Sequence, residues 1–221
     1  MAALAVSNCA KFPRVSVLVT SFEDWQVEKR EFELLISAQA WHWVSAEVRY
    51  PKAHHALCPS GSLALFWNRP IWYESSLGEP LAAIYERIAP ELYGLGPWFP
   101  GFRHSPAADG SNGQFCPGRW LTDGEQTEIE QSCYFQSVVE RSYHWTLEHS
   151  TGEYLDLLRT LPEHGDLGKS EREALFDSVA GVIDGSGGTI QMQYETKLYF
   201  ARRAESVNTT EPPAEVPFCH G

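Results

Sequence analysis

The chain has 221 residues, of which 43% are hydrophobic and 21% charged, and a formal net charge of −12. This acidity repels phosphate backbones and argues against a nucleic-acid substrate. The five cysteines show no C-x-x-C spacing, so we expect neither a disulfide framework nor a metal site, and free thiols suit a reducing, cytoplasmic setting.

The first third of the chain alternates apolar runs with a helical pattern. We expect the end of a helix over residues 2–10 and a strand over Val15–Thr20 (VSVLVT), followed by a polar turn. A second strand is predicted at Phe32–Ala38 and a helix at Ala46–Leu57. Pro59-Ser60-Gly61 indicates a turn before a third strand at Ser62–Trp67. Strands and helices that alternate with short links predict a parallel α/β sheet.

The remaining chain begins with a helix predicted at Pro80–Leu92. Residues 94–118 are rich in Gly, Pro and Ser and are expected to form a long loop or lid. Strand-like alternation follows over Cys133–Leu147.

Two more helices are predicted, at Ser150–Leu161 with Ser150 or Thr151 as the N-cap and at Ser170–Ile183 with a capping box from Ser170 to Glu173. A glycine-rich turn at 185–188 leads to a long strand at Thr189–Ala201, and we expect a disordered tail over residues 204–221.

Three of these segments, in this order, resemble strands 3, 4 and 5 of class I S-adenosylmethionine-dependent methyltransferases, in the small-molecule branch called methyltransferase type 11. They are Val15–Trp25, Phe32–Val44 and Ala53–Asn68. The most specific element is Ala40-Trp41-His42-Trp43-Val44 before a helix, followed by Leu57-x-Pro59-x-Gly61. The family has L-(R/K)-P-G-G at that second place, and this chain departs from it at Cys58 and Ser60.

The resemblance implies a Rossmann-like α/β fold with a mainly parallel sheet and a closing antiparallel hairpin, formed by residues 1–203 as a partial methyltransferase domain. The family's first strand, its G-x-G-x-G loop and the acid that takes the ribose hydroxyls have no counterpart before Val15. We therefore expect the chain to lack the family's first strands and to be an N-terminally truncated fragment.

The family resemblance also implies where S-adenosyl-L-methionine binds. The turn after the first predicted strand lies against the adenine in the family, which points to Ser21, Phe22 and Glu23. The end of the central strand lies beside the methionine portion, which points to Gln39, Ala40 and Trp41. The alternative for Ser21 is a cap on a short helix.

Methyl transfer requires few side chains, because the sulfonium is already an activated donor. His42 is the candidate general base, with a purely structural histidine as the alternative. The acceptor is expected to be a small molecule. Its pocket is predicted from residues at strand ends and from aromatic islands, each of which packing alone could also explain: Trp43, Trp67, Asn68, Arg69, Trp98, Phe99, Tyr143 and Trp145.

Two other interpretations stay open at this stage. One is a non-catalytic remnant of such an enzyme that lacks the glycine-rich cofactor loop. The other is an NAD-dependent Rossmann enzyme, which is disfavoured because its glycine fingerprint is also missing.

The apolar stretch from Ala2 to Val6 is too short to span a bilayer and has no basic flank, so we expect neither a signal peptide nor a transmembrane helix.

Overall fold

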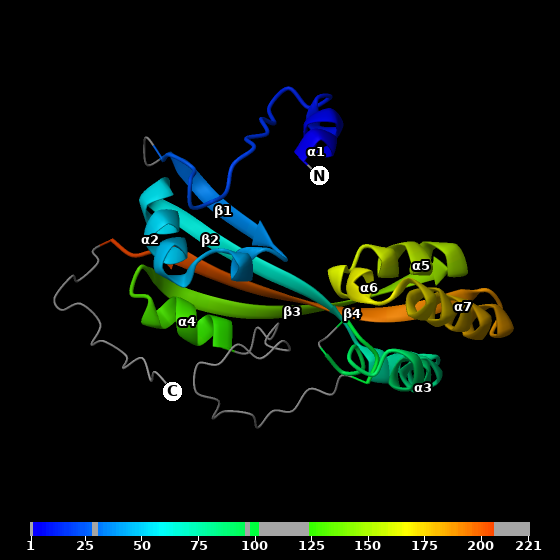
Figure 1. Cartoon of the computed structure of the whole chain (residues 1–221). Helices are drawn as coiled ribbons and strands as arrows, with labels where there is room; N and C mark the ends of the chain where they lie inside the picture. Colours follow the sequence, from blue (N-terminus) through cyan, green and yellow to red (C-terminus); the bar gives the residue numbers. More distant parts are fainter. Residues whose placement is uncertain (1, 28–30, 96–97, 102–123, 206–221) are drawn as a thin grey trace, which may run out of the picture. The chain divides into compact units, whose positions relative to one another are not determined.

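The computed structural model describes residues 2–27, 31–95, 98–101 and 124–205 (Figure 1). Most of the predicted loop at 94–118 and nearly all of the predicted tail at 204–221 lie outside these residues. The described elements follow in chain order: α1 (Ala2–Cys9), β1 (Phe32–Ala38), the 3₁₀ helix η1 (Trp41–Trp43), α2 (Ala46–Ala56), β2 (Leu57–Pro70), the 3₁₀ helix η2 (Trp72–Glu74), α3 (Gly78–Ile88), α4 (Glu125–Gln131), β3 (Phe135–Ser150), α5 (Thr151–Arg159), α6 (Pro162–Asp166), α7 (Lys169–Gly185) and β4 (Thr189–Arg203).

The described strands form one four-stranded sheet in the order β1-β2-β4-β3. The amide of Glu31 donates to the carbonyl of Ala56, so the starts of β1 and β2 lie together and this pair is parallel. The amide of Ile71, just after β2, donates to the carbonyl of Gln193 in β4. Asn68 instead pairs with Thr196, so the residue numbers run in opposite senses and this pair is antiparallel.

The outer pair, β4 and β3, is antiparallel as well, because Ala204 bonds Tyr134 whereas Thr196 bonds Trp145. The expected α/β fold with a closing antiparallel strand pair is therefore present. The expectation of a mainly parallel sheet is corrected: among the described strands only β1 and β2 run parallel. Alternating apolar residues indicate that a strand is half buried, but the alternation is the same for both directions, so strand direction could not be predicted from it.

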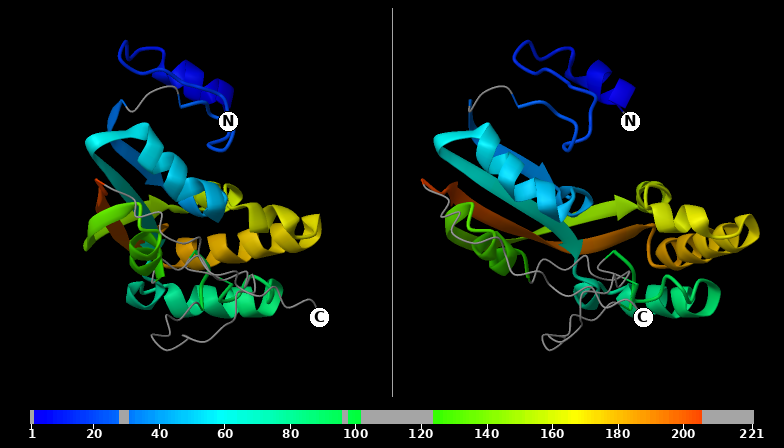
Figure 2. Two further views of the ribbon diagram at one scale, coloured as in Figure 1. Left: turned by 90° about the vertical axis from the view of Figure 1, so that its left-hand side faces the viewer. Right: turned by 60° about the vertical axis from the view of Figure 1, so that its left-hand side comes forward.

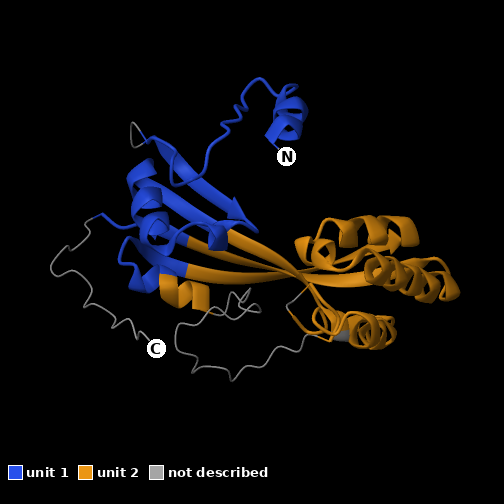
Figure 3. Ribbon diagram, in the orientation of Figure 1, with its two compact units in different colours: residues 1–64, 129–138, 201–221 blue, residues 65–128, 139–200 orange. Residues whose placement is uncertain are grey.

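The chain divides into two compact units, shown in separate colours in Figure 3. Unit 1 comprises residues 1–64, 129–138 and 201–221, and unit 2 comprises residues 65–128 and 139–200. In unit 1, helix α2 buries Tyr50, Ala53 and His54, whose spacing is that of one helical face. The ring of Tyr50 meets Phe135, and His54 Nε2 bonds the carbonyl oxygen of Ala204 at 3.0 Å, which joins the helix to the ends of β3 and β4.

Unit 2 has the larger apolar core. Helices α3 and α5 both pack on α7, and Figure 2 shows α5 and α7 side by side. Each helix contributes one buried stripe, and β4 supplies alternate side chains to the same core: Leu81, Ile84, Tyr85, Tyr154, Leu158, Leu175, Val179, Ile183, Ile190, Met192 and Tyr194. Helix α5 begins with the expected cap, since Ser150 and Glu153 form a complete capping box.

Three local expectations are wrong. Val15–Thr20 is not a strand, although it is β-branched, because strand propensity becomes a strand only where a neighbouring ladder satisfies the backbone. The turn predicted at residues 59–61 does not precede the strand but lies inside β2, which already begins at Leu57. The chain bends there, because a Cβ atom at Gly61 would lie 2.9 Å from Leu57 Cβ, four residues earlier. Ser170 is inside α7, whose N-cap is Gly168, so the predicted capping box is absent.

Gly61 lies close both to its own strand and to β1. A Cβ atom at this position would lie 3.0 Å from the carbonyl oxygen of Phe32 and 2.9 Å from Leu57 Cβ. Glycine therefore permits the close approach of β1 to the start of β2.

Candidate functional site

The turn after the N-terminal segment is held against helix α2. Ser21 Oγ accepts a hydrogen bond from the amide of Asp24 at 3.0 Å, so Ser21 caps this turn. The Glu23 carboxylate accepts a hydrogen bond from the amide of Ser45, the N-cap residue of α2, at 2.9 Å. That bond is the main reason that the pKa of Glu23 lies below its ordinary value, and it places a negative charge at the positive end of the helix.

Docking of this turn creates an aromatic group in unit 1. The Phe22 ring lies 5.8 Å from the rings of both Trp25 and Trp41, and Trp25 lies 5.6 Å from Phe32. The ammonium of Lys52 lies 5.9 Å from the centre of the Phe22 ring. The predicted residue Phe22 is thus brought to Trp41, a second predicted residue, although the two are separated by β1 in the sequence.

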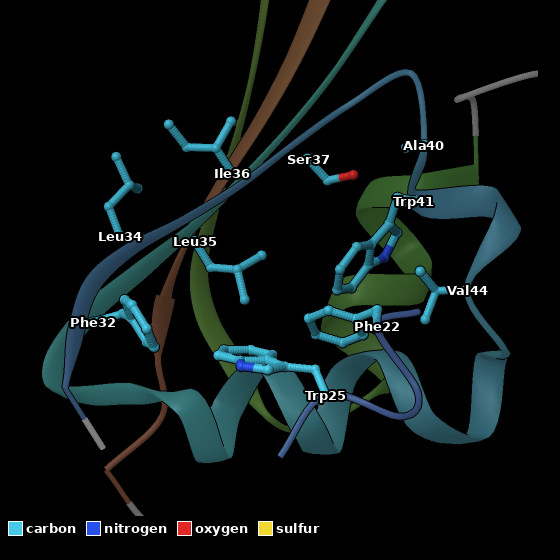
Figure 4. A pocket seen from close by; sticks show the side chains of 10 residues that line it. All are labelled: Phe22, Trp25, Phe32, Leu34, Leu35, Ile36, Ser37, Ala40, Trp41 and Val44. Atoms are coloured by element: carbon cyan, nitrogen blue, oxygen red, sulfur yellow. The ribbon is translucent and has the colours of Figure 1, made fainter. Parts of the chain in front are cut away.

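These aromatic side chains border a cavity of about 410 Å³ that is open on one side (Figure 4). Its walls are almost entirely apolar, and Ser37 contributes the one side-chain hydroxyl of the lining, which consists of Phe22, Trp25, Phe32, Leu34, Leu35, Ile36, Ser37, Ala40, Trp41 and Val44. Among the six residues predicted to contact the cofactor, Phe22, Ala40 and Trp41 line this cavity, whereas Ser21, Glu23 and Gln39 do not.

The chain turns sharply where β1 ends. Gln39 has a φ of +55°, a left-handed conformation that costs a non-glycine residue free energy, of the order of 1 kcal/mol. Ala40 follows, and the short helix η1 then places Trp41 in the interior of unit 1 at 1% exposure. Strain of this kind at the carboxyl end of a strand is common where a backbone is shaped for a ligand.

The next two residues of η1 lie outside the cavity lining. His42 is half buried, and burial, followed by the positive charge of Arg49, lowers the pKa of its imidazole. Its ring lies 5.0 Å from that of Trp43, which is 71% exposed. His42 is therefore neutral near pH 7 and able to accept a proton, while Trp43 is exposed to solvent.

A second group of predicted residues meets in unit 2. Trp145 Nε1 donates to Thr196 Oγ1 at 2.9 Å, and Thr196 in turn donates to Asn68 Oδ1 at 2.6 Å. Trp145 also stacks on Tyr194, with ring centres 4.4 Å apart, and Trp98 lies 6.3 Å from the same tyrosine. Asn68, Trp98 and Trp145 are thus linked through two β4 residues that sequence reasoning missed.

The other predicted pocket residues of unit 2 lie in different surroundings. Trp67 is buried and packs edge-on against Tyr199, and Phe99 is buried beside His164. Tyr143 is exposed on β3.

Arg69 forms a 2.6 Å ion pair with Glu195. Burial pushes the pKa of Glu195 upward, but hydrogen bonds from Ser142 and Arg69 outweigh it, and the net shift is downward.

The missed residues carried weak signals. Trp25 stands in the predicted turn itself, three residues after Phe22, and on one turn of chain this spacing brings two rings together. Tyr194 and Thr196 alternate along β4 like any half-buried strand, so nothing in the sequence separated them from core positions. Tyr194 is tied to His149 by a 3.2 Å hydrogen bond, and burial raises the pKa of its phenol to about 12.

Within the described ranges, no cluster of three or more His, Cys, Asp or Glu side chains is placed to hold a metal ion. The cysteines of these ranges, Cys9, Cys58 and Cys133, are free thiols. None of the described helices combines the length and apolar character needed to cross a bilayer.

No protein-family model matches the chain. The chain is similar to methyltransferases. Uncharacterized methyltransferases of Mycobacterium bovis and Mycobacterium tuberculosis are 32% identical to it over 59 residues, which is 27% of this chain. The match spans about a quarter (24%) of the length of these relatives.

Two solved structures described as methyltransferases align with most of this chain. A putative methyltransferase from Bacillus halodurans aligns with 90% of this chain and 76% of its own, at 12% identity and a TM-score of 0.44. Phosphoethanolamine N-methyltransferase 2 of Haemonchus contortus, in complex with phosphomonomethylethanolamine and S-adenosylhomocysteine, aligns with 92% of this chain and 41% of its own, at 11% identity and a TM-score of 0.41.

Proposed function

We propose that this chain is part of an S-adenosylmethionine-dependent methyltransferase that acts on a small-molecule acceptor. The observation that carries the proposal is the aromatic cavity along β1. Its lining includes Phe22, Ala40 and Trp41, which the family resemblance assigns to the cofactor. The order β1-β2-β4-β3, with a parallel pair beside an antiparallel strand, agrees with the expected late strands of that family. The methyltransferase-named relatives support the same activity.

The cavity suits the base and thioether portions of the cofactor. Its volume of about 410 Å³ falls within the range of small-molecule sites, and Phe22, Trp25 and Trp41 offer aromatic faces to a purine. Ser37 adds a hydroxyl. When bound, the cofactor supplies an activated methyl group. This chain's residues would hold it in place and keep water from the apolar walls.

The lining contains no carboxylate, so the ribose hydroxyls are not matched by any lining residue. Glu23, which was predicted to contact the cofactor, is engaged with the N-terminus of α2 instead. We therefore assign Ser21 and Glu23 the task of positioning Phe22, and Gln39 the task of directing Ala40 and Trp41. Ser21, Glu23 and Gln39 would thus act indirectly, through the three cavity residues Phe22, Ala40 and Trp41.

The proposed proton acceptor is His42. Its lowered pKa keeps the imidazole neutral at physiological pH, which is the form required of a general base. In unit 2 the proposed acceptor contacts are the linked residues Asn68, Trp98 and Trp145, with Trp67, Arg69 and Tyr143 as further predicted members. Trp43, the remaining predicted member, belongs to unit 1. An aromatic set of this kind suits a small and partly apolar acceptor.

We further propose that the protein acts in the cytoplasm, without nucleic-acid or membrane partners.

The test is binding of S-adenosylhomocysteine, measured by calorimetry and by thermal shift. A ligand that binds only the native state at 100 times its Kd stabilises it by about 2.7 kcal/mol, which for a chain of this size raises Tm by roughly 5–10 °C. Phe22→Ala removes one stacking face and should weaken binding about 5- to 150-fold. Phe12→Ala, an exposed phenylalanine outside the cavity, is the matched control. Absence of any shift at millimolar ligand would refute the proposal.

A further inference from the structure

Two oppositely charged side chains are partly buried on one face of the sheet in unit 2. Arg69, the last residue but one of β2, and Glu195 of β4 have side chains that are only 18% and 14% exposed. Arg69 Nε and Nη2 lie 2.7 and 2.6 Å from the same carboxylate oxygen, Oε2 of Glu195. Ser142 of β3 donates a further hydrogen bond to Glu195. Three neighbouring strands therefore hold this guanidinium in one orientation.

The ion pair uses only one edge of the guanidinium. Arginine carries five N–H donors in a planar fork, and in Arg69 the edge formed by Nε and Nη2 faces Glu195. Nη1 has no hydrogen-bond partner in the part of the chain that the structure describes. It is not among the buried polar atoms that lack a partner either, so it reaches the surface. The end edge of the guanidinium, formed by Nη1 and the second N–H of Nη2, is therefore open to a ligand.

An open guanidinium edge has a definite chemical preference. Its two parallel N–H groups match the two oxygens of a carboxylate or a phosphate, which can accept both bonds at once. Because Glu195 already fixes the guanidinium, little side-chain freedom is left to lose when an anion binds. Lys197 lies on the same face and pairs with Glu140 at 3.3 Å. The two cations and the two carboxylates balance, so no net local charge opposes an anion.

The position of Arg69 favours a binding role over a purely structural one. It lies at the carboxyl end of β2, the end at which open α/β sheets hold their ligands, and it directly follows Asn68, one of the proposed acceptor contacts. A buried ion pair adds little to stability, because the cost of removing two charges from water offsets most of their attraction. What the open edge can bind therefore accounts for this pair better than stability does.

We propose that Arg69 binds an anionic group of the methyl acceptor, a carboxylate or a phosphate, through Nη1 and Nη2. This names the chemical class of the acceptor and so rests on the proposed function, whereas the binding of an anion by itself does not. Glu195 is a positioning residue, because it orients the guanidinium without touching the acceptor. The acceptor would thus combine an anionic end with the small, partly apolar body that the aromatic side chains of unit 2 favour.

The experiment is an NMR titration of the full chain with sodium phosphate and, separately, with sodium succinate. Each salt replaces sodium chloride at constant ionic strength, so that the screening of charges stays the same. Backbone amide signals of β2 and β4 around Arg69 should shift saturably, with a Kd in the millimolar range. Saturation by either anion supports the proposal, and the anion that binds more tightly identifies the group on the acceptor. The absence of a saturable shift with both anions up to about 50 mM overturns it.

A conservative variant tests the fork rather than the charge. Arg69→Lys keeps the positive charge and can still pair with Glu195, but it loses one charge-assisted hydrogen bond to the anion, so binding should weaken about 10- to 150-fold. Arg87→Lys, at an exposed position of α3, is the matched control and should bind like the wild type. Far-UV circular dichroism establishes that both variants are folded. Equal weakening by the two variants, or full binding by Arg69→Lys, overturns the proposal.

S-adenosylhomocysteine separates this inference from the proposed function. Succinate or phosphate should still bind when S-adenosylhomocysteine is saturating, and Arg69→Lys should leave the Tm shift caused by S-adenosylhomocysteine unchanged. Competition between the two ligands would place Arg69 at the carboxylate of the cofactor and overturn its assignment to the acceptor. A Tm shift without anion binding overturns the anion site alone. Anion binding without a Tm shift overturns the proposed methyl transfer, and with it the acceptor as the source of the anion.

Discussion

Acidification should destabilise the protein through one buried histidine in unit 2. His164 is 1% exposed, its Nε2 is hydrogen-bonded to Tyr85 Oη at 2.8 Å, and the rings of Phe99 and Phe176 lie 5.4 and 5.7 Å away. Its Nδ1 has no hydrogen-bond partner. Burial lowers the pKa of His164 from 6.5 to about 4, because a charged imidazole would lose its hydration in these surroundings.

The direction of this pH effect depends on whether the folded or the unfolded chain binds the proton at the higher pH. Above pH 6.5 the imidazole is neutral in both states, and its full contribution to stability is present. Between pH 6.5 and about 4, His164 is protonated in the unfolded chain but stays neutral in the folded chain. The free energy of unfolding therefore falls as pH falls. At about 1.4 kcal/mol per unit the loss approaches roughly 2–3 kcal/mol by pH 4.

Urea denaturation at several pH values between 7.5 and 4.5, followed by far-UV circular dichroism, measures this loss. The double variant Tyr85→Phe with His164→Leu removes the titrating group without leaving a buried hydroxyl unpaired. Its free energy of unfolding should fall less on acidification than that of the wild type, by about 2 kcal/mol. Replacement of the exposed His55 by leucine should leave the wild-type slope. An unchanged slope in the double variant would show that His164 does not carry the effect.

Two further predictions concern unit 1. Gly61→Ala should lower the free energy of unfolding by about 1–3 kcal/mol in urea titrations, because its Cβ would press on the carbonyl oxygen of Phe32; a neutral result contradicts the close approach. The NMR titration of His42 should give a pKa below 6.5, and Arg49→Gln should raise it partway, since burial is the larger cause; a value above 6.5 refutes the assignment.

The sequence by itself determined the local elements whose patterns are strong. The apolar run at Phe32–Ala38, the helix from Ala46 and the cap at Ser150 appear where their spacing placed them, because each depends on neighbours within a few residues. The sequence, through its family resemblance, also pointed to Phe22, Ala40 and Trp41, three of the residues that line the cavity.

The tertiary structure alone decided strand direction, the fate of Val15–Thr20 and the partners of each polar side chain. A β-branched run becomes a strand only beside another strand, and the local amino-acid pattern does not predict whether such a neighbouring strand is present. The bond from Thr196 to Asn68 joins residues 128 positions apart, and the contact of Glu23 with Ser45 spans 22. Such pairings arise when the chain folds back on itself, so they set the candidate site without leaving a local signal in the sequence.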